Sequence, residues 1–492
     1  MCKVFKFIFL MCLFGSLSGC FKGKSVDLII HNAHIHTLND KEDVFEAIAI
    51  KDGKIIEVGP ERQILNRYRS KDEIDAGGKD IYPGFTDSYG HIIDFAKRKL
   101  CVDLTGTRSY DELLVRLEKH DQLNTNSFII GQGLDTSLWN SKEKLTNGRL
   151  NKLFPKKFVC LYLLGEESVM ANNEFLRKSK LENINGFVTG NSLNFVSDFL
   201  PSYSKKLIKN TILEIQNELF QYGITGVHEV DLEFESLNVF KDLVKSNQLY
   251  LNIDGILAPT EKNIEFAKKH KKYKFKNLTV RSFHANSKIS MEELKRLALV
   301  CESSGYQLSV DCLNSKNNTF IFDIFSTINN VNKDHRWRLE NAQNLTPKEY
   351  IQSVQLGVFH TIVPNQAITD FSNFSFKSVL NQSGMVSIGS NFPIQKFNPF
   401  LTIHISSQGL NSDNSILKGI ISKELLTLNE CIKGMTTWSS YASFEERNIG
   451  TLEKGKDATL VLFEFPVATS QTFRQNYAFM TFIKGKKVYS IE

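Results

Sequence analysis

The chain has few cysteines for its length, and none of them forms a closely spaced pair. Eight occur among 492 residues, without a Cys-x-x-Cys motif. Beyond Cys20, an odd number remains at irregular spacing: Cys101, Cys160, Cys301, Cys312 and Cys431. This pattern excludes a zinc knuckle and a disulfide framework, and it predicts that most of these cysteines are small buried apolar residues.

The sequence also lacks the signatures of several function classes. The net charge is only +6, and lysines alternate with acidic residues without a long basic block, so we expect no nucleic-acid partner. The 37 phenylalanines are scattered, which is typical of core filling. Neither a glycine-rich phosphate loop nor a Gly-x-Ser-x-Gly elbow occurs, so neither chemistry is expected.

The N-terminal residues predict a lipoprotein signal peptide. Lys3 and Lys6 precede an apolar run over 7–14, and residues 17–20 read Leu-Ser-Gly-Cys, which resembles a bacterial lipobox. The run is too short to span a bilayer comfortably. We therefore expect residues 1–19 to be removed and Cys20 to carry lipid, anchoring the protein to a membrane of the cell envelope. Phe21, which stands where an aspartate would redirect sorting, favours the outer membrane if the organism is Gram-negative.

Both ends of the remaining chain are rich in predicted strands. Residues 26–30, 47–50 and 54–58 are apolar runs, and Asp52-Gly53 between the last two predicts a hairpin. At the other end, the predicted strands are 458–463, 479–483 and 487–491.

The middle of the chain, residues 83–446, alternates between short apolar runs and helical patterns. The apolar runs include 128–131, 158–161, 226–228, 278–280, 307–310 and 385–388, and the helical patterns include 204–222, 290–303 and 346–356. Such alternation predicts an α/β fold with a parallel sheet, either a barrel or a doubly wound sheet, and periodicity does not distinguish the two.

A series of motifs between residues 26 and 491 resembles the amidohydrolase superfamily. The similarity is to its amidohydrolase 3 branch, which includes N-substituted formamide deformylase-like enzymes. The matching segments are 47–59 (AIAIKDGKIIEVG), 83–91 (PGFTDSYGH against PGFxDxHxH), 131–135 with Trp139 (GxGxD…W), 223–229 (GITGVHE), 338–343 (RLENAQ against RIEHAQ), 389–393 (GSNFP against GSDxP) and the closing 449–458.

The resemblance implies a (β/α)8 TIM-like barrel over 83–446 and a small β-sandwich formed by 20–82 and 447–492. In such enzymes, His and Asp side chains at the C-terminal ends of the strands hold one or two divalent metal ions. The metal activates water, and an Asp after the last strand takes its proton.

The positions of this family's metal ligands carry other residues here. Tyr89, Asp311 and Asn341 stand where the motifs have histidine, Asn391 stands at the usual catalytic aspartate, and His91 is retained. A neutral phenol is a poor ligand, and an amide cannot act as a base. His91 and Asp311 are fewer donors than the three or four, roughly, of a tight zinc site. We therefore expect degenerate motifs, no bound metal and no confident catalytic residue.

A fixed cation is predicted to replace the metal. Arg281 falls near the lysine of strand four in the family, and we hypothesise that it pairs with Asp311. The predicted pocket residues are Tyr89, His91, Asp135, Trp139, His228, Arg281, Asp311, Asn341 and Asn391. For several of them a structural role is an open alternative, since Asp135 and Trp139 could equally cap a loop and fill a gap.

Two functions follow from this reading. The first is a metal-free, catalytically impaired family member that binds a small polar molecule. The alternative is a hydrolase of non-peptide carbon–nitrogen bonds, acting on amide or formamide-like substrates through a rebuilt zinc or other divalent-metal site that recruits His228, Glu229 or His284.

Overall fold

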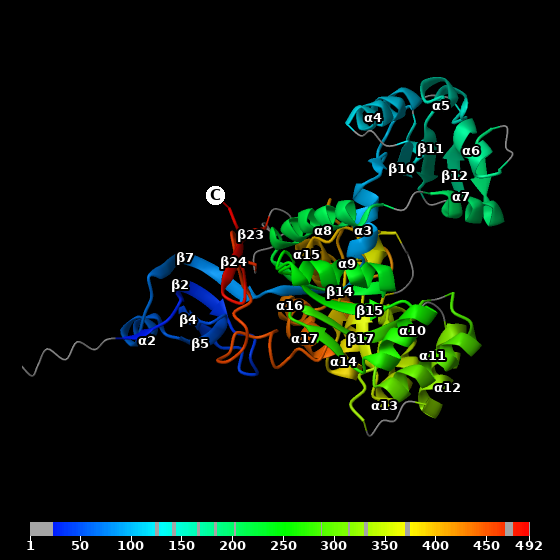
Figure 1. The fold of residues 1–492 in the computed structure, drawn as a ribbon. Coiled ribbons are helices and arrows are strands. Elements are labelled where there is room, and N and C mark those ends of the chain that lie inside the picture. The colour runs from blue at the N-terminus through cyan, green and yellow to red at the C-terminus, as the bar shows by residue number, and fades with distance from the viewer. Residues whose placement is uncertain are drawn as a thin grey trace, which may run out of the picture.

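The structure has three parts: a sheet built from both chain ends, a barrel, and an inserted sheet (Figure 1). The computed structural model describes residues 23–491 except 124–126, 140–143, 165–167, 182–184, 201–202, 287, 313–314, 329–332, 370–373 and 468–475. The predicted signal peptide and Cys20 lie outside the described residues. Within the described part, none of the helices has the length and apolar character needed to cross a bilayer.

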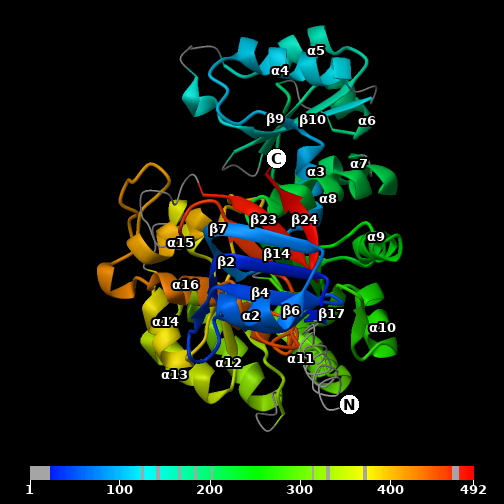
Figure 2. The same ribbon diagram turned by 90° about the vertical axis from the view of Figure 1, so that its left-hand side faces the viewer.

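The two chain ends fold together into one sheet, which Figure 2 shows from its broad side. Its strands, in spatial order, are β5 (Lys54–Gly59), β4 (Ala47–Lys51), β2 (Leu28–His36), β7 (Asp72–Pro83), β22 (Leu460–Phe463), β23 (Ala478–Ile483) and β24 (Lys486–Ser490), with β3 (Val44–Phe45) beside β2. The predicted hairpin at Asp52-Gly53 is confirmed, since it joins β4 to β5. β7 pairs with both β2 and β22, so one long strand joins the two ends of the chain. Helix α2 (Glu61–Arg67) and the short pair β1 (Lys24–Ser25) and β6 (Tyr68–Arg69) complete this part.

The central part is a nearly closed barrel of parallel strands, so the predicted TIM-like fold is confirmed. Its strands follow chain order: β8 (Phe85–Gly90), β14 (Ile224–Leu232), β15 (Asn252–Leu257), β17 (Leu278–Ala285), β18 (Gln307–Asp311), β19 (Arg338–Glu340), β20 (Phe359–Ile362) and β21 (Ser387–Ile388). The barrel closes after β21, where the backbone N–H of Asn391 donates to the backbone carbonyl of Tyr89 at 2.9 Å. Gly389 permits this approach, because a Cβ there would lie 2.5 Å from the Tyr89 nitrogen. Short β16 (Tyr273–Phe275) pairs antiparallel with β17.

Helices surround the barrel and bury their apolar faces against it. They are α3 (Ile92–Lys99), α8 (Lys205–Phe220), α9 (Phe234–Lys245), α10 (Glu261–Lys269), α11 (Met291–Ser304), α12 (Ser315–Ile328), α13 (Pro347–Gln355), α14 (Phe376–Ser383), α15 (Pro399–Gln408), α16 (Leu428–Gly434) and α17 (Thr437–Ala442), with short 3-10 turns η3 (Ala342–Asn344), η4 (Pro364–Ile368) and η5 (Ser422–Glu424). The three helical patterns predicted from the sequence are confirmed as α8, α11 and α13. In α8, Ser204 caps the first turn, and Ile208, Ile212, Ile215 and Leu219 recur on one buried face.

A separate five-stranded sheet is inserted between α3 and α8, and it stands beside the barrel in Figure 1. Its elements are β9 (Val102–Asp103), α4 (Tyr110–Leu123), β10 (Phe128–Leu134), η1 (Thr136–Leu138), α5 (Gly148–Leu153), β11 (Phe158–Leu163), β12 (Ser168–Ala171), α6 (Asn173–Lys178), β13 (Phe187–Thr189), η2 (Gly190–Ser192) and α7 (Leu193–Phe199). The apolar runs 128–131 and 158–161 therefore belong to this insertion and not to the barrel. A short apolar run does not specify its neighbour, so the sequence could not separate the two sheets.

Candidate functional site at the barrel rim

Three side chains converge on the carboxylate of Asp311 at the C-terminal ends of the barrel strands. The Tyr89 hydroxyl and the Asn341 amide Nδ2 each donate to Asp311 Oδ1 at 3.0 Å. His284 Nε2 lies 3.2 Å from the same oxygen. We call Tyr89, His284, Asp311 and Asn341 the rim cluster. Asp311 ends β18, and the three side chains around its oxygen come from β8, β17 and the residue after β19, so three other segments hold one carboxylate oxygen.

His284 is held between two carboxylates. Its Nδ1 lies 2.8 Å from Asp231 Oδ1, while Nε2 faces Asp311. Burial opposes its charge, but the neighbouring Asp311 and Asp231 carboxylates prevail and raise the pKa of His284 to about 10. For Asp231, burial acts to raise the pKa, but the hydrogen bond to His284 lowers that pKa below the usual value. The site thus contains a buried imidazolium between two acids, with the Asp231 side chain 36% exposed toward solvent.

The two aromatic rings on and after β8 are electrically neutral. Burial and the adjacent Asp311 raise the pKa of Tyr89 well above its usual value, so the phenol remains a hydrogen-bond donor. Burial lowers the pKa of His91, whose ring bonds to the Val230 carbonyl. The Tyr89 ring meets the His91 ring edge-on at 5.5 Å and the His284 ring edge-on at 6.0 Å. His91 is therefore packed beside the rim cluster and tied to the backbone.

Asn341 and Asn391 both adopt the left-handed backbone conformation, which asparagine tolerates better than most residues. Asn341 has a φ of 57°, and its Oδ1 accepts a bond from Gln366 Nε2 at 2.8 Å. Asn391 has a φ of 61°. Its buried Oδ1 accepts no hydrogen bond from the described residues. Both polar atoms of the Asn341 side chain thus have hydrogen-bond partners, while the buried Oδ1 of Asn391 has none among the described residues.

Two buried acids, Asp87 and Glu229, fix the geometry around the rim. Asp87 accepts bonds from the Tyr89 and Ser390 amides at 3.1 and 3.0 Å, which ties β8 to the segment after β21. Glu229 accepts the Ile92 and Ile93 amides at 2.6 and 3.0 Å at the start of α3. Burial raises the pKa of Glu229 to about 8. These contacts give Glu229 a structural role beside His91.

A second charged layer lies deeper in the barrel and contains His228. Arg338 is fully buried, with Nε 2.8 Å from Glu340 Oε1. Its Nη1 donates to His228 Nδ1 at 3.1 Å. Because guanidinium can only donate, His228 accepts at Nδ1 and is neutral. Burial and Arg338 also lower the pKa of His228 well below its usual value. His228 therefore supports the barrel interior and does not belong to the rim cluster.

The predicted pairing of Arg281 with Asp311 is wrong. Arg281 is the fourth of the eight residues of β17, three residues before His284, and its Nη2 donates to Glu445 Oε1 at 3.1 Å. The pairing of β15 with β17 is irregular here: Gly255 faces Val280, and the next partner pair is Ile256 with Ser282. This irregularity changes which side chains face inward beyond Arg281, and it brings His284 to Asp311. The cation next to Asp311 is therefore histidine.

Asp135 and Trp139 are not near the rim cluster, which corrects their assignment to its pocket. Both lie in the inserted sheet. Asp135 caps η1 by accepting the Ser137 amide at 2.9 Å, and the Trp139 ring packs at 5.6 Å from that of Tyr110. Asp135 is therefore a loop cap and Trp139 a packing residue, which is the structural alternative given for them from the sequence.

The rim side chains do not offer the free electron pairs that a divalent metal ion needs as ligands. Asp311 Oδ1 is approached by three donors, and both nitrogens of His284 face carboxylates. Tyr89 is neutral and Asn391 carries an amide, so the electron pairs that a metal needs are occupied or weak. Among the described residues, no group of three or more His, Cys, Asp or Glu side chains is arranged to hold a metal.

Comparison with known proteins identifies the family. The amidohydrolase family matches residues 72–489, so this chain belongs to that family. It is 21% identical to a Bacillus subtilis protein named amidohydrolase YtcJ, over 93% of this chain and 97% of the relative. The N-substituted formamide deformylase of Arthrobacter pascens is 29% identical over 19% of this chain and 18% of its own.

Solved structures show the same fold. An uncharacterized metal-dependent hydrolase from Pyrococcus furiosus superimposes with a TM-score of 0.76 at 16% identity, over 90% of this chain and 100% of that chain. An adenosine deaminase from Xanthomonas campestris with bound zinc gives a TM-score of 0.60 at 13% identity, over 95% and 94% of the two chains. At these identities the likeness concerns the fold alone.

Proposed function

We propose that this protein is a metal-free amidohydrolase family member whose rim binds a small polar molecule without hydrolysing it. The observation that carries the proposal is the occupation of Asp311. Tyr89, Asn341 and His284 satisfy one oxygen of a carboxylate that would otherwise be available to a metal. Each protonated donor that holds this oxygen competes with a metal for the same electron pairs.

A positive charge is still supplied at the rim, and it comes from a proton on His284. Asp231, which is 36% exposed, and the open Oδ1 of Asn391 are acceptors that a ligand's N–H or O–H groups could meet. Such groups fix the orientation of a polar molecule, since buried polar atoms require partners. Nothing in this arrangement provides a nucleophile with a general base beside it.

The alternative function is hydrolysis of a non-peptide carbon–nitrogen bond through a rebuilt metal site. Family membership favours it, together with the gathering of His91, His284 and Asp311 at one end of the barrel. It would require the proton of His284 and the hydrogen bonds of Tyr89 and Asn341 to be displaced by the metal.

Elemental analysis and an activity assay separate these functions. Protein purified with zinc or manganese present is expected to contain far less than one metal ion per chain and to leave N-substituted formamides and other amides intact. Stoichiometric metal together with hydrolysis would overturn the proposal.

A restoration variant sharpens this test. Tyr89→His, Asp311→His, Asn341→His and Asn391→Asp together return the family's residue types to the rim. We expect this variant to gain metal binding. The matched control, Tyr89→Phe, Asp311→Asn, Asn341→Ala and Asn391→Ala, disturbs the same positions without supplying ligands and should gain none. Metal uptake by both variants would show that the restored residues are not its cause.

The lipid anchor is a separate proposal, because Cys20 lies outside the described residues. It rests on the lipobox-like sequence before that cysteine. Mass spectrometry of the N-terminal peptide should find a diacylglyceryl group on Cys20, and Cys20→Ala should release the protein from membranes. Membrane association that persists unchanged in this variant would contradict the anchor.

A further inference from the structure

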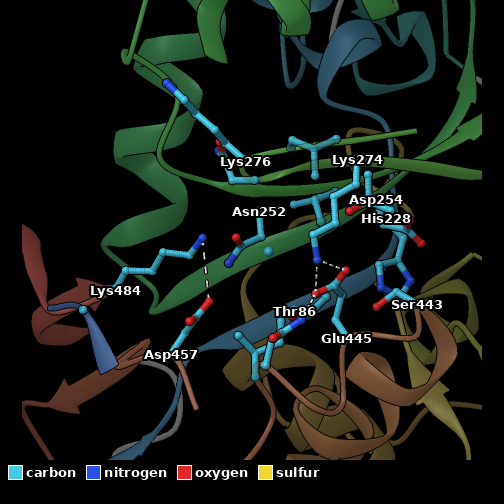
Figure 3. A pocket seen from close by; sticks show the side chains of 18 of the residues that line it. Thr86, His228, Asn252, Asp254, Lys274, Lys276, Ser443, Glu445, Asp457 and Lys484 are labelled. Atoms are coloured by element: carbon cyan, nitrogen blue, oxygen red, sulfur yellow. Dashed lines mark hydrogen bonds and ion pairs between the residues drawn. The ribbon is translucent and has the colours of Figure 1, made fainter. Parts of the chain in front are cut away.

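A pocket lies at the other end of the barrel, away from the rim cluster. This cavity of about 340 Å³ opens where the N-terminal ends of the barrel strands face the terminal sheet, and we call it the floor pocket (Figure 3). Thr86, Asn252, Asp254 and Thr279 line its barrel side, and Lys484 belongs to its terminal-sheet side. Its size falls within the range of small-molecule sites, about 300–1,000 Å³.

Asp254 is the unusual residue of the floor pocket. It is only 5% exposed, yet neither of its carboxylate oxygens accepts a hydrogen bond from the described chain. On β15 it stands opposite His228 and Thr279, so all three project to the inside of the barrel. The amide Nδ2 of Asn252, two residues earlier on the same face, also lacks a partner. Buried polar groups are almost always satisfied, so this carboxylate calls for a donor from outside the chain.

The cations nearest to Asp254 are committed to other acids. Arg281 and Lys274 both bind Glu445, at 3.1 and 2.6 Å. Arg338 binds Glu340 in the layer above. Three fixed positive charges therefore have closer acidic partners, and the Asp254 carboxylate remains without a direct counter-ion.

The far side of the floor pocket carries exposed lysines. In Figure 3, Lys276 and Lys484 lie on the side opposite Asp254 and His228. Lys276 donates to the neutral Asn247 side chain at 2.5 Å and forms no ion pair with a described residue. Lys484 is 3.7 Å from Asp457, which already binds Lys54 at 2.5 Å. The floor pocket thus has the Asp254 carboxylate at one end and, at the other, two lysines without a close carboxylate of their own.

We propose that the floor pocket binds a small zwitterion, with its ammonium group on Asp254 and its carboxylate near Lys276 and Lys484. The ammonium supplies the hydrogen bonds and the charge that Asp254 lacks, and the carboxylate neutralises the lysines at the opening. This site is independent of the rim cluster and of the function proposed for it.

Titration calorimetry on the full chain in mild detergent tests the proposal. The probes are glycine, β-alanine and γ-aminobutyrate, with butyrate and n-butylamine as single-charge controls. We expect at least one zwitterion to bind one-to-one with a Kd below about 1 mM, and more tightly than either control. No binding of any zwitterion up to about 10 mM would overturn the site. Equal affinity for n-butylamine would overturn the role of the lysines.

Variants locate the binding. Asp254→Asn should raise the Kd for the zwitterion by at least roughly tenfold, and Lys276→Ala should raise it by a smaller factor. Asp242→Asn, which removes an exposed carboxylate on α9, is the matched control and should bind normally. Unchanged affinity in Asp254→Asn would sink the proposal. If that variant folds poorly, NMR of isotope-labelled aspartate in the unmodified protein decides, because the Asp254 carboxyl signal must shift when the zwitterion binds.

Discussion

Two aspartates at opposite ends of the barrel interior, Asp311 at the rim and Asp254 at the floor, differ in how their carboxylates are satisfied. Asp311 at the rim meets two hydrogen-bond donors and the His284 ring, whereas Asp254 at the floor receives no hydrogen bond from the described residues. Both are buried or nearly so. The difference teaches that a buried carboxylate can be satisfied by the chain's own donors, as at the rim, where Tyr89 and Asn341 donate to Asp311. The unsatisfied acid lies at the floor.

Removal of the rim carboxylate should have the largest effect. Asp311→Leu leaves the Tyr89 hydroxyl and the Asn341 amide without their acceptor and removes one counter-charge of His284. We expect a loss of about 3–5 kcal/mol in the free energy of unfolding, measured by urea denaturation. A loss below about 1 kcal/mol would mean that the rim network contributes little to stability.

The buried imidazolium predicts a pH dependence. The pKa of His284 is raised to about 10 in the folded protein, from roughly 6.5 in an unfolded chain. Its stabilising contribution is therefore complete below about pH 6.5 and disappears as the pH rises through about 10, by up to roughly 5 kcal/mol. His284→Gln should lose this dependence, so the difference between the two urea-denaturation profiles isolates it. Parallel profiles would contradict a protonated His284.

The floor acid predicts the opposite response to substitution. Burial raises the pKa of Asp254 to about 7, above its usual 3.8. The folded state therefore loses stability as the pH rises from about 4 to 7, since the carboxyl group must ionise without a partner. Asp254→Asn should stabilise the protein by about 1–3 kcal/mol at pH 8 and by much less at pH 4. Destabilisation at pH 8 would show that Asp254 already has a favourable partner.

Removal of a single rim donor should have the smallest effect. Tyr89→Phe deletes one bond to Asp311 but retains the ring and the other contacts, so we expect a loss of about 1 kcal/mol in thermal or urea unfolding. Tyr489→Phe, on the terminal sheet, is a control for loss of a partly exposed phenol and should change stability by less. Equal effects of the two substitutions would deny Tyr89 a role at Asp311.

The alternation of strands and helices could be predicted from local pattern, whereas the choice of a barrel over a doubly wound sheet depended on the resemblance to the amidohydrolase family. The residue types of the rim could be read from motifs in the sequence. Tyr89, Asp311, Asn341 and Asn391 were placed by motifs that follow strand ends, and the structure gathers them at one end of the barrel. Asp231 and Gln366 were missed, although Asp231 lies two residues after Glu229 at the end of the same strand. Their importance comes from partners far away in the sequence, His284 and Asn341.

The sequence by itself determined which segments of the barrel are strand-like or helical, that both chain ends are rich in strands, and that a phenol and two amides stand where the family's motifs have histidine or aspartate. Only the tertiary structure decided that His284, and not Arg281, faces Asp311, that two apolar runs form an inserted sheet, and that Asp254 lacks a partner. Local propensity and side-chain chemistry are written in neighbouring residues. Strand register and burial depend on contacts between distant segments, and these set which charge meets which.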